Sequence, residues 1–232
     1  MALVAHQQER KRTVRSFVRR AGRLTPAQKR ALCELWPAFG IAFSDKPLDF
    51  NLIFGRTALK VLEIGFGNGE TLVEQAAATP SMDFIGIEVH EPGVGHCLLY
   101  TKAAKISNLR LISHDAIDVM HHQISDASLR RINLYFPDPW PKKKHHKRRI
   151  LQHDFLQLAS RKISPGGTLN IATDWEHYAE QIDDLISSDE KFRLSERRVH
   201  SGGAPLDRPT TKFERRGIRQ GHRIWDWQFI RN

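Results

Sequence analysis

Short apolar segments alternate with amphipathic segments along most of the chain after residue 58. The apolar segments predict strands at 59–65, 83–89, 109–113, 131–136 and 168–173, followed by two later strands at about 192–199 and 223–230. The amphipathic stretches predict helices at roughly 70–78, 92–105, 116–123, 149–163 and 175–187. The two late strands are joined by a loop that contains Gly and Pro.

This order of elements predicts the fold class. Strands that are almost continuously apolar are buried on both faces, and the helices between them return the chain to a parallel neighbour. We therefore expect an α/β protein with a doubly wound, mostly parallel sheet of seven strands and helices on both faces. In such sheets ligands bind at the carboxyl ends of the strands.

The first forty residues form a basic extension of this pattern. Thr25-Pro26-Ala27-Gln28 is a capping box with proline at the first helical position, so a helix should run from Pro26 to about Trp36. Residues 1–22 should be flexible in isolation. We expect two parts, a basic N-terminal arm and helix at 1–40 and a ligand-binding domain at 41–232.

The net charge of +10 is concentrated in three segments of the 232-residue chain. Residues 1–30 carry +8, residues 142–149 carry +6 and residues 208–232 carry +5, which leaves the rest of the chain at −9. Clustered cations favour a polyanion because they release its counterions. The segregation of charge therefore predicts a polyanionic partner, with a merely solvated basic tail as the alternative.

Other classes are disfavoured by composition. Cys33 and Cys97 lie far apart without paired spacing, which argues against a disulfide framework or a zinc site and fits a reducing cytosol. The adjacent pairs His121-His122 and His145-His146 have no Cys or acid that would complete a recognisable ligand set, so we expect no metal. No apolar run approaches transmembrane length, so we expect no membrane association and a cytoplasmic protein.

A glycine-rich loop follows the first strand of the alternating region. Gly65, Gly67 and Gly69 form a G-x-G-x-G pattern preceded by Glu63, which differs from the G-x-G-x-x-G spacing of dinucleotide-binding loops. The loop has no Lys or Arg for a pyrophosphate. An acid in this place suits a cofactor that has a sulfonium and an amino group and lacks phosphate.

Acids also follow the next two strands. Glu88 ends the second strand, where a carboxylate can accept both hydrogen bonds of a ribose diol. Asp115 follows the third strand and can accept from an adenine amino group. Each of the two has an alternative role as the N-cap of the next helix. Three acids at consecutive strand ends beside the glycine loop favour a cofactor site.

A rigid turn follows the fourth strand. Phe136-Pro137-Asp138-Pro139-Trp140-Pro141 should project at the same rim as the glycine loop, because parallel strands end at one edge of the sheet. The prolines preorganise Asp138, and Trp140 can form an aromatic wall beside a base. The alternative is a proline-rich turn with a buried tryptophan.

Three longer motifs resemble those of one enzyme family. They are FPDPWPKKKHHKRR at 136–149, TDWEHYA at 173–179 and RPTTKFERRG at 208–217. The chain resembles the bacterial tRNA (guanine-N7)-methyltransferases over about residues 57–232. This family is Rossmann-like and depends on S-adenosylmethionine, and Ser164-Pro165-Gly166-Gly167 is a further feature of that class. The resemblance implies methylation of guanosine N7 at position 46 in the tRNA variable loop.

The resemblance also implies roles for individual residues. It implies that the cofactor is contacted by Glu63, Glu88, Asp115 and Asp138, of which Asp138 is also the catalytic residue. It implies that the substrate is contacted by Lys142, Asp174, Thr211, Lys212, Phe213 and Glu214. It implies that RNA is bound by Lys144, His145, His146, Lys147, Arg148 and Arg149. The expected partner is tRNA, and the expected assembly is a monomer or a homodimer.

Alternatives remain open at this level. Amino-nitrogen methyltransferases carry D/N-P-P-Y/F/W at the fourth strand end, whereas this chain has one proline where that motif needs two. A non-catalytic RNA-binding module on the same fold is the other alternative, and the three acids argue against it. Asp174 can simply cap a helix before Trp175, and Glu214 can form a surface ion pair with Arg215 or Arg216.

Overall fold

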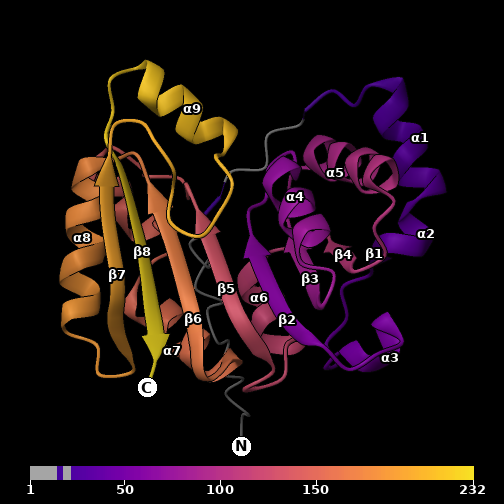
Figure 1. The fold of residues 1–232 in the computed structure, drawn as a ribbon, viewed down its shortest axis with the longest axis horizontal. Helices are drawn as coiled ribbons and strands as arrows, with labels where there is room; N and C mark the ends of the chain where they lie inside the picture. The colour runs from indigo at the N-terminus through magenta and orange to yellow at the C-terminus, as the bar shows by residue number, and fades with distance from the viewer. Residues whose placement is uncertain (1–14, 18–21) are drawn as a thin grey trace, which may run out of the picture.

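The computed structural model describes residues 15–17 and 22–232, and an eight-stranded sheet runs through this part of the chain (Figure 1). The strand order is β1-β4-β3-β2-β5-β6-β8-β7, and β8 pairs antiparallel with both β6 and β7. All other neighbours are parallel. The strands are β1 (Gly40–Ile41), β2 (Leu59–Ile64), β3 (Met82–Ile87), β4 (Leu109–Ile112), β5 (Leu129–Tyr135), β6 (Ile163–Thr173), β7 (Phe192–His200) and β8 (Ile224–Arg231).

The structure confirms the predicted α/β, doubly wound, mostly parallel fold. Each of the seven predicted strands is present, and the eighth, β1, is a two-residue edge strand beside β4. It is too short to leave a periodic signal in the sequence. The strand β6 begins at Ile163, five residues earlier than predicted, because residues 163–167 include a bulge against β5.

The five crossover helices lie where the amphipathic segments predict them. They are α4 (Glu70–Ala78), α5 (Glu91–Ala104), α6 (Ala116–His122), α7 (His153–Lys162) and α8 (Glu176–Ser187). The helix predicted from residue 149 starts only at His153, because the basic run before it forms a separate 3₁₀ helix, η1 (Lys143–Arg148). The pattern also missed two helices, α3 (Phe50–Phe54) and α9 (Lys212–Arg219).

The N-terminal helix α1 (Pro26–Glu34) starts at the predicted residue and is followed by α2 (Trp36–Phe39). Both halves of its capping box form, since Gln28 N donates to Thr25 Oγ1 and Thr25 N donates to Gln28 Oε1. Ala31 packs into the same core as α4 and α5. The division at residue 40 stays a prediction, and residues 1–14 and 18–21 of the predicted arm lie outside the described residues.

Two cores cover the two faces of the sheet. Leu62 and Ile64 belong to a core that contains residues of α6, α7 and α8, whereas Val61 belongs to a core formed with α1, α4 and α5. Successive residues of a strand point to opposite faces, so Glu63 lies on the same face as Val61 and under α4. The alternation therefore places one acidic side chain inside an otherwise apolar layer.

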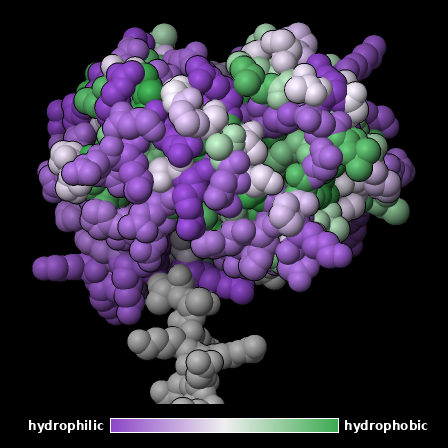
Figure 2. All heavy atoms as spheres, turned by 90° about the horizontal axis from the view of Figure 1, so that it is seen from below, coloured by the Kyte–Doolittle hydropathy of each residue, from purple (hydrophilic) through white to green (hydrophobic). Residues whose placement is uncertain are grey.

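The two ends of the sheet differ in character. Figure 1 shows α9 above the ends to which the arrows of the parallel strands point. Figure 2 views the opposite end, where hydrophilic residues dominate and hydrophobic ones form scattered groups. In the described part of the chain, no helix combines the length and apolar character needed to cross a membrane.

Candidate functional site

The glycine-rich loop between β2 and α4 has a backbone that other residues rarely adopt. Gly65, Gly67 and Gly69 have φ angles of 74°, 59° and 79°, in the left-handed region. At Gly69 an added Cβ would lie 2.3 Å from Cys97 Sγ of α5, so α5 packs directly against the loop. A Cβ at Gly65 would meet no atom within 4 Å, which leaves that side of the loop open to a ligand.

Glu88 holds this loop from the neighbouring strand. Its Oε2 accepts a hydrogen bond of 2.9 Å from Gly67 N, and its Oε1 accepts from Val89 N at 2.7 Å and His90 N at 3.0 Å. The alternative role as an N-cap is wrong, because His90 is the N-cap of α5. Glu88 therefore fixes the loops that follow β2 and β3 relative to each other.

Glu63 is buried at the base of the loop, with 3% of its surface exposed. Gln75 Nε2 of α4 donates to Glu63 Oε2 at 3.2 Å. Burial raises the pKa of Glu63 from 4.5 to about 7, against the lowering effect of hydrogen bonds from Asn133 and Gln75. The carboxyl is therefore poised to change its charge near neutral pH.

Two hollows meet at the glycine loop. The larger, of about 660 Å³, is lined by Glu88, His114, Asp138 and Trp140 among others. The smaller, of about 350 Å³, is lined by Glu63, the loop and residues of α9. The two hollows share the residues Gly65, Gly67, His90, Tyr135, Phe136 and Phe213. One elongated ligand can therefore occupy both.

The turn after β5 is strained and tightly held. Phe136 and Trp140 have φ angles of 50° and 44°, which bulky residues adopt only under external support. Arg149 supplies part of that support, since its Nε donates to Pro139 O at 2.8 Å from beneath the turn. The exposed residue Asp138 lies between the two strained positions and lines the larger hollow.

Trp140 is covered from two directions. The Arg148 guanidinium lies 4.3 Å from the Trp140 ring centroid, and the ring of His145 meets it edge-on at 5.9 Å. Its Nε1 donates to Ser16 O at 3.1 Å, so Ser16 lies against the turn, and Ser16 and Phe17 help line the larger hollow. The indole is half-buried in a wall of the hollow and is not part of the core.

Asp115 caps the helix α6, with its side chain accepting from Ile117 N at 3.0 Å. The structure thus shows the N-cap alternative. Burial raises the pKa of Asp115. His114 and Ala116 line the larger hollow, whereas Asp115 is not among the lining residues. Its contact with a cofactor stays a prediction.

The predicted RNA-binding run divides into surface and interior residues. Lys142, Lys144 and Lys147 are exposed. Arg149 is only 2% exposed, and its Nη1 donates to Gln181 Oε1 at 2.5 Å in the interior. Its guanidinium is therefore an interior group that supports the fold, and its burial argues against the predicted RNA contact. The sequence could not separate it from its neighbours, because all are equally basic.

The two histidines of the run have different neighbours but a pKa shift in the same direction. Desolvation, followed by the charges of nearby Lys and Arg side chains, lowers the pKa of both His145 and His146. His146 Nε2 also lies 3.3 Å from Arg149 Nη2. Both imidazoles are therefore neutral at pH 7 and add hydrogen-bonding groups, without charge, to the run.

Asp174 lies at the end of β6 and pairs with a histidine from the turn before β8. Its Oδ2 is 3.2 Å from His222 Nδ1, and both side chains are about one-third exposed. The N-cap alternative is wrong, because Trp175 occupies the N-cap of α8 and Asp174 forms no cap hydrogen bond. The Asp174 carboxylate also packs on Gly217 of α9, where an added Cβ would lie 2.8 Å from Oδ2.

Thr211 and Glu214 begin the helix α9. They form a capping box in which Thr211 Oγ1 accepts from Glu214 N and Glu214 Oε2 accepts from Thr211 N. The Glu214 side chain is fully buried and pairs with Arg208, so the alternative of a surface ion pair with Arg215 or Arg216 is wrong. A base contact by Glu214 stays a prediction. The other predicted substrate residues here, Thr211, Lys212 and Phe213, line the smaller hollow.

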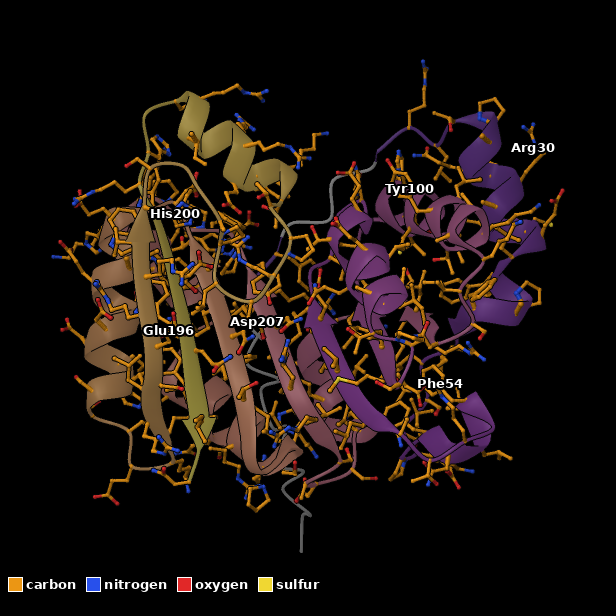
Figure 3. The ribbon with its side chains drawn as sticks, viewed as in Figure 1. Arg30, Phe54, Tyr100, Glu196, His200 and Asp207 are labelled. Atoms are coloured by element: carbon orange, nitrogen blue, oxygen red, sulfur yellow. The ribbon has the colours of Figure 1, made fainter. Side chains whose placement is uncertain are left out.

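Residues that the sequence analysis missed complete this region. Arg208, Asp226 and His200 form a buried cluster with Glu214, and Figure 3 shows His200 at the upper end of β7 below α9. A signal was present in Asp226, since a charged residue within the apolar strand IWDWQFI requires a partner. In the described part of the chain, no group of three or more His, Cys, Asp or Glu side chains is suited to a metal ion.

Comparison with known proteins identifies the family. A family described as "Putative methyltransferase" matches residues 57–227. The tRNA (guanine-N(7)-)-methyltransferase of Nitrosococcus oceani is 50% identical over 221 residues, which cover 95% of this chain and 92% of that protein. The protein of the same name from Pseudomonas aeruginosa is 50% identical over 231 residues, covering 99% and 95%. The chain belongs to the tRNA (guanine-N(7)-)-methyltransferase family.

Solved structures share the methyltransferase fold at low sequence identity. TrmN from Thermus thermophilus has a TM-score of 0.54 and 18% identity, over 79% of this chain and 47% of TrmN, so the chain spans about half the length of TrmN. An antibiotic-related methyltransferase has a TM-score of 0.57 and 15% identity, over 81% of this chain and 98% of that one.

As a member of the tRNA (guanine-N(7)-)-methyltransferase family, the chain uses S-adenosylmethionine as its cofactor. The residues of the site fit this molecule. The open backbone at Gly65 leaves room for close approach, and the loop has no Lys or Arg that would favour a pyrophosphate. The carboxyl groups of Glu63 and Glu88 suit a ligand with two cationic groups and a ribose diol.

Proposed function

We propose that the protein transfers a methyl group from S-adenosylmethionine to N7 of a guanosine in tRNA. The observation that carries the proposal is the 50% identity, over almost the whole chain, to relatives named for this reaction. The geometry supports it, because Asp138 and the glycine loop line one continuous hollow. Position 46 of the tRNA is the expected target nucleotide.

The chemistry requires alignment more than proton transfer. Guanine N7 is an acceptor with a free lone pair, so no proton has to leave it before it attacks. S-adenosylmethionine supplies a methyl group on a sulfonium, and the electrons of the broken carbon–sulfur bond stay on sulfur as N7 becomes methylated. The methylated ring is cationic. A protein that holds N7 in line can gain much of its rate from proximity alone.

Asp138 is the proposed catalytic residue. It lies between strained Phe136 and Trp140, in a turn whose backbone Arg149 holds at Pro139 O, and this rigid turn positions Asp138 before the substrate arrives. A fixed negative charge next to the ring stabilises the positive charge that develops there in the transition state. Asp138 thus orients and stabilises, and no obligatory proton transfer is assigned to it.

The cofactor contacts are proposed residue by residue. Glu63 lies in the smaller hollow and is assigned to the ammonium group of the cofactor. Glu88 lies in the larger hollow and is assigned to the ribose diol, with Oε2 already held by Gly67 N and Oε1 by Val89 N and His90 N. Asp115, which caps α6, is assigned to the adenine amino group.

The RNA contacts divide between base and backbone. Guanine presents N–H donors on its Watson–Crick edge, and Asp174 is the proposed acceptor for them, held by His222. Lys142, Thr211, Lys212 and Phe213 are proposed to contact the target nucleotide. Lys144, Lys147 and Arg148, with neutral His145 and His146, are proposed to contact phosphates farther along the RNA.

Incubation of the protein with tritiated S-adenosylmethionine and unmodified bulk tRNA tests the function. Transfer of label, followed by nucleoside mapping that places it in 7-methylguanosine, is the expected result. Label in an amino-methylated base would support the amino-nitrogen alternative. Binding of tRNA without any transfer would support a non-catalytic RNA-binding module. Either of these two outcomes refutes the proposal.

A further inference from the structure

Three cations of α9 form a stripe along one side of the smaller hollow. Lys212, Arg216 and Arg219 are spaced i, i+4 and i+7, which places them on one face of the helix. All three are exposed, and all three line the hollow opposite the glycine loop. Within the described part of the chain, none of them lies within ion-pair distance of a carboxylate. We call these three residues the α9 cation stripe.

The remaining cation between them behaves differently. Arg215 lies off the stripe and does not line the hollow. Its Nη2 lies 3.4 Å from Glu70 Oε2 of α4, and its Nη1 donates to Thr210 O at 2.9 Å. Tyr100 of α5 donates to the other oxygen of Glu70 at 3.3 Å, so Glu70 contacts residues of both α5 and α9. The pair of Arg215 and Glu70 is largely exposed and contributes little to the position of α9, whereas the stripe faces the hollow.

The floor of the same hollow has the opposite character. Glu63 contributes a buried carboxyl, and the loop backbone is open at Gly65. Glu70 also lines the hollow, but its two oxygens are already held by Arg215 and Tyr100. A hollow with a buried acid on its floor and cations along one side suits a ligand with an ammonium and a carboxylate close together. An α-amino acid group has both on a single carbon.

We infer that the α9 cation stripe, with Arg216 at its centre, binds the α-carboxylate of the methionine portion of S-adenosylmethionine. The inference rests on the proposed function only in taking this molecule as the cofactor. The hollow joins the larger one through Gly65, Gly67 and Phe136, so its position matches the amino-acid end of a ligand whose nucleoside lies beside Glu88.

An RNA phosphate is the competing anion for the same cations. The smaller hollow is the poorer place for it, because Glu63 would face a phosphate with a second negative charge. The stripe extends over about 10 Å of helix axis, so one carboxylate can reach only one or two of its members. Lys212, at one end, therefore remains available for the proposed contact with the target nucleotide. The experiment must therefore separate loss of cofactor affinity from loss of RNA affinity.

Binding of S-adenosylhomocysteine, and of its analogue without the α-carboxylate, can be measured by calorimetry in the absence of RNA. Wild-type protein should bind the complete molecule about ten- to a hundredfold more tightly, the range of a charge-assisted hydrogen bond. Arg216→Gln, and a triple variant that also contains Lys212→Gln and Arg219→Gln, should lose most of this preference. Arg215→Gln, on the same helix and off the stripe, should keep it.

The inference is overturned if the triple variant retains the wild-type preference for the carboxylate. If that variant keeps the preference and also binds tRNA more weakly, with a smaller salt dependence, the stripe instead binds RNA phosphates. The substituted side chains are exposed, and a thermal melt of each variant checks that it folds. Failure of the proposed function would instead appear as absence of N7 methylation in a protein that still discriminates the two ligands.

Discussion

Arg208 forms a bidentate hydrogen-bonded pair with Asp226, a residue of β8, which lies between β6 and β7 in the sheet. Its Nε donates to Asp226 Oδ1 at 2.8 Å and its Nη2 to Oδ2 at 3.1 Å, while Nη1 donates to Glu214 Oε2 at 2.5 Å. The guanidinium also lies 5.4 Å from the ring centroid of Phe136, one of the two strained residues of the turn after β5. Arg208 therefore ties α9 and β8 to that turn.

Replacement of Arg208 by Gln should destabilise the protein by about 3–5 kcal/mol, because it leaves two buried carboxylates without their cation. Urea denaturation measures the change in the free energy of unfolding. Arg197→Gln is the matched control, since Arg197 pairs with Asp183 at 2.8 Å while both side chains are about 40% exposed. The control should change stability by no more than about 1 kcal/mol. Equal effects of the two substitutions would contradict the assigned role of Arg208.

The periodic elements could be read from the sequence, whereas the partners within this cluster could not, even though Asp226 signals that a partner is needed. The strands β2 to β6 are short apolar runs whose neighbours can be deduced from their order, so the fold and the rim of the site followed. The helix α9 escaped because Phe213 and Ile218 are its only apolar side chains, and the position that packs on Asp174 is Gly217, which has no side chain. Its stability comes from the capping box and Arg208, and partnerships across the fold leave no local period.

The same limit applies to individual charges. Arg149 and Arg148 are adjacent and chemically identical, yet one is buried beneath Pro139 and the other lies over Trp140. Glu214 stands next to Arg215 and Arg216 in the sequence, and only the fold shows that its side chain is interior. The acids at strand ends were found because the topology of a parallel sheet brings them to one edge.

Cofactor binding should depend on pH through Glu63. Its pKa of about 7 means that the carboxyl is largely neutral at pH 6 and ionised at pH 8. Because the ionised form attracts an ammonium group, the affinity for S-adenosylhomocysteine should rise by up to about tenfold over this range. Glu63→Gln should weaken binding at pH 8 and abolish the pH dependence. An unchanged pH profile in that variant would exclude Glu63 as its source.

The stability of the ligand-free protein should show the opposite trend. The pKa of Glu63 is higher in the folded protein than its ordinary value of 4.5, so the folded state holds this proton more tightly than the unfolded chain. Stability from this group is lost as the pH rises from about 4.5 to 7, by an amount on the order of 3 kcal/mol. Glu63→Gln should therefore unfold at higher urea concentration than wild type at pH 8, and a lower midpoint would contradict the shift.

Substitution of Asp138 should slow chemistry more than binding. Asp138→Asn keeps the shape of the side chain and removes its charge, and Asp138→Ala removes both. If the carboxylate stabilises charge in the transition state, both variants should lose about a hundredfold or more in the single-turnover rate. Their affinity for tRNA should change little. Near-wild-type rates for both would eliminate this role.

Three cations of the basic run, the exposed Lys144 and Lys147 and the half-buried Arg148, should act mainly on binding. A triple variant with Lys144, Lys147 and Arg148 changed to Gln removes three of the proposed phosphate contacts. The affinity for tRNA should fall, and the slope of log affinity against log salt should become less steep by about two to three. Single-turnover rates at saturating tRNA should stay close to wild type. A salt slope equal to that of wild type would place the RNA elsewhere.

The pair of Asp174 and His222 gives the most specific test of base recognition. Asp174→Ala should abolish most RNA turnover while leaving the affinity for S-adenosylhomocysteine unchanged, because Asp174 lines neither hollow. His222→Ala removes the hydrogen-bonding group that lies 3.2 Å from Asp174 Oδ2, and it should lower kcat/KM for tRNA by about tenfold.

His222→Asn retains a donor for Asp174 and should recover part of the loss in kcat/KM. A purely structural role for His222 would lower the melting temperature of both variants and would not distinguish Asn from Ala in turnover. If Asp174 positions the guanine, the effect of His222→Ala should also disappear in an Asp174→Ala background, because nothing remains for the imidazole to hold. Additive losses in the double variant would show that the two residues act separately.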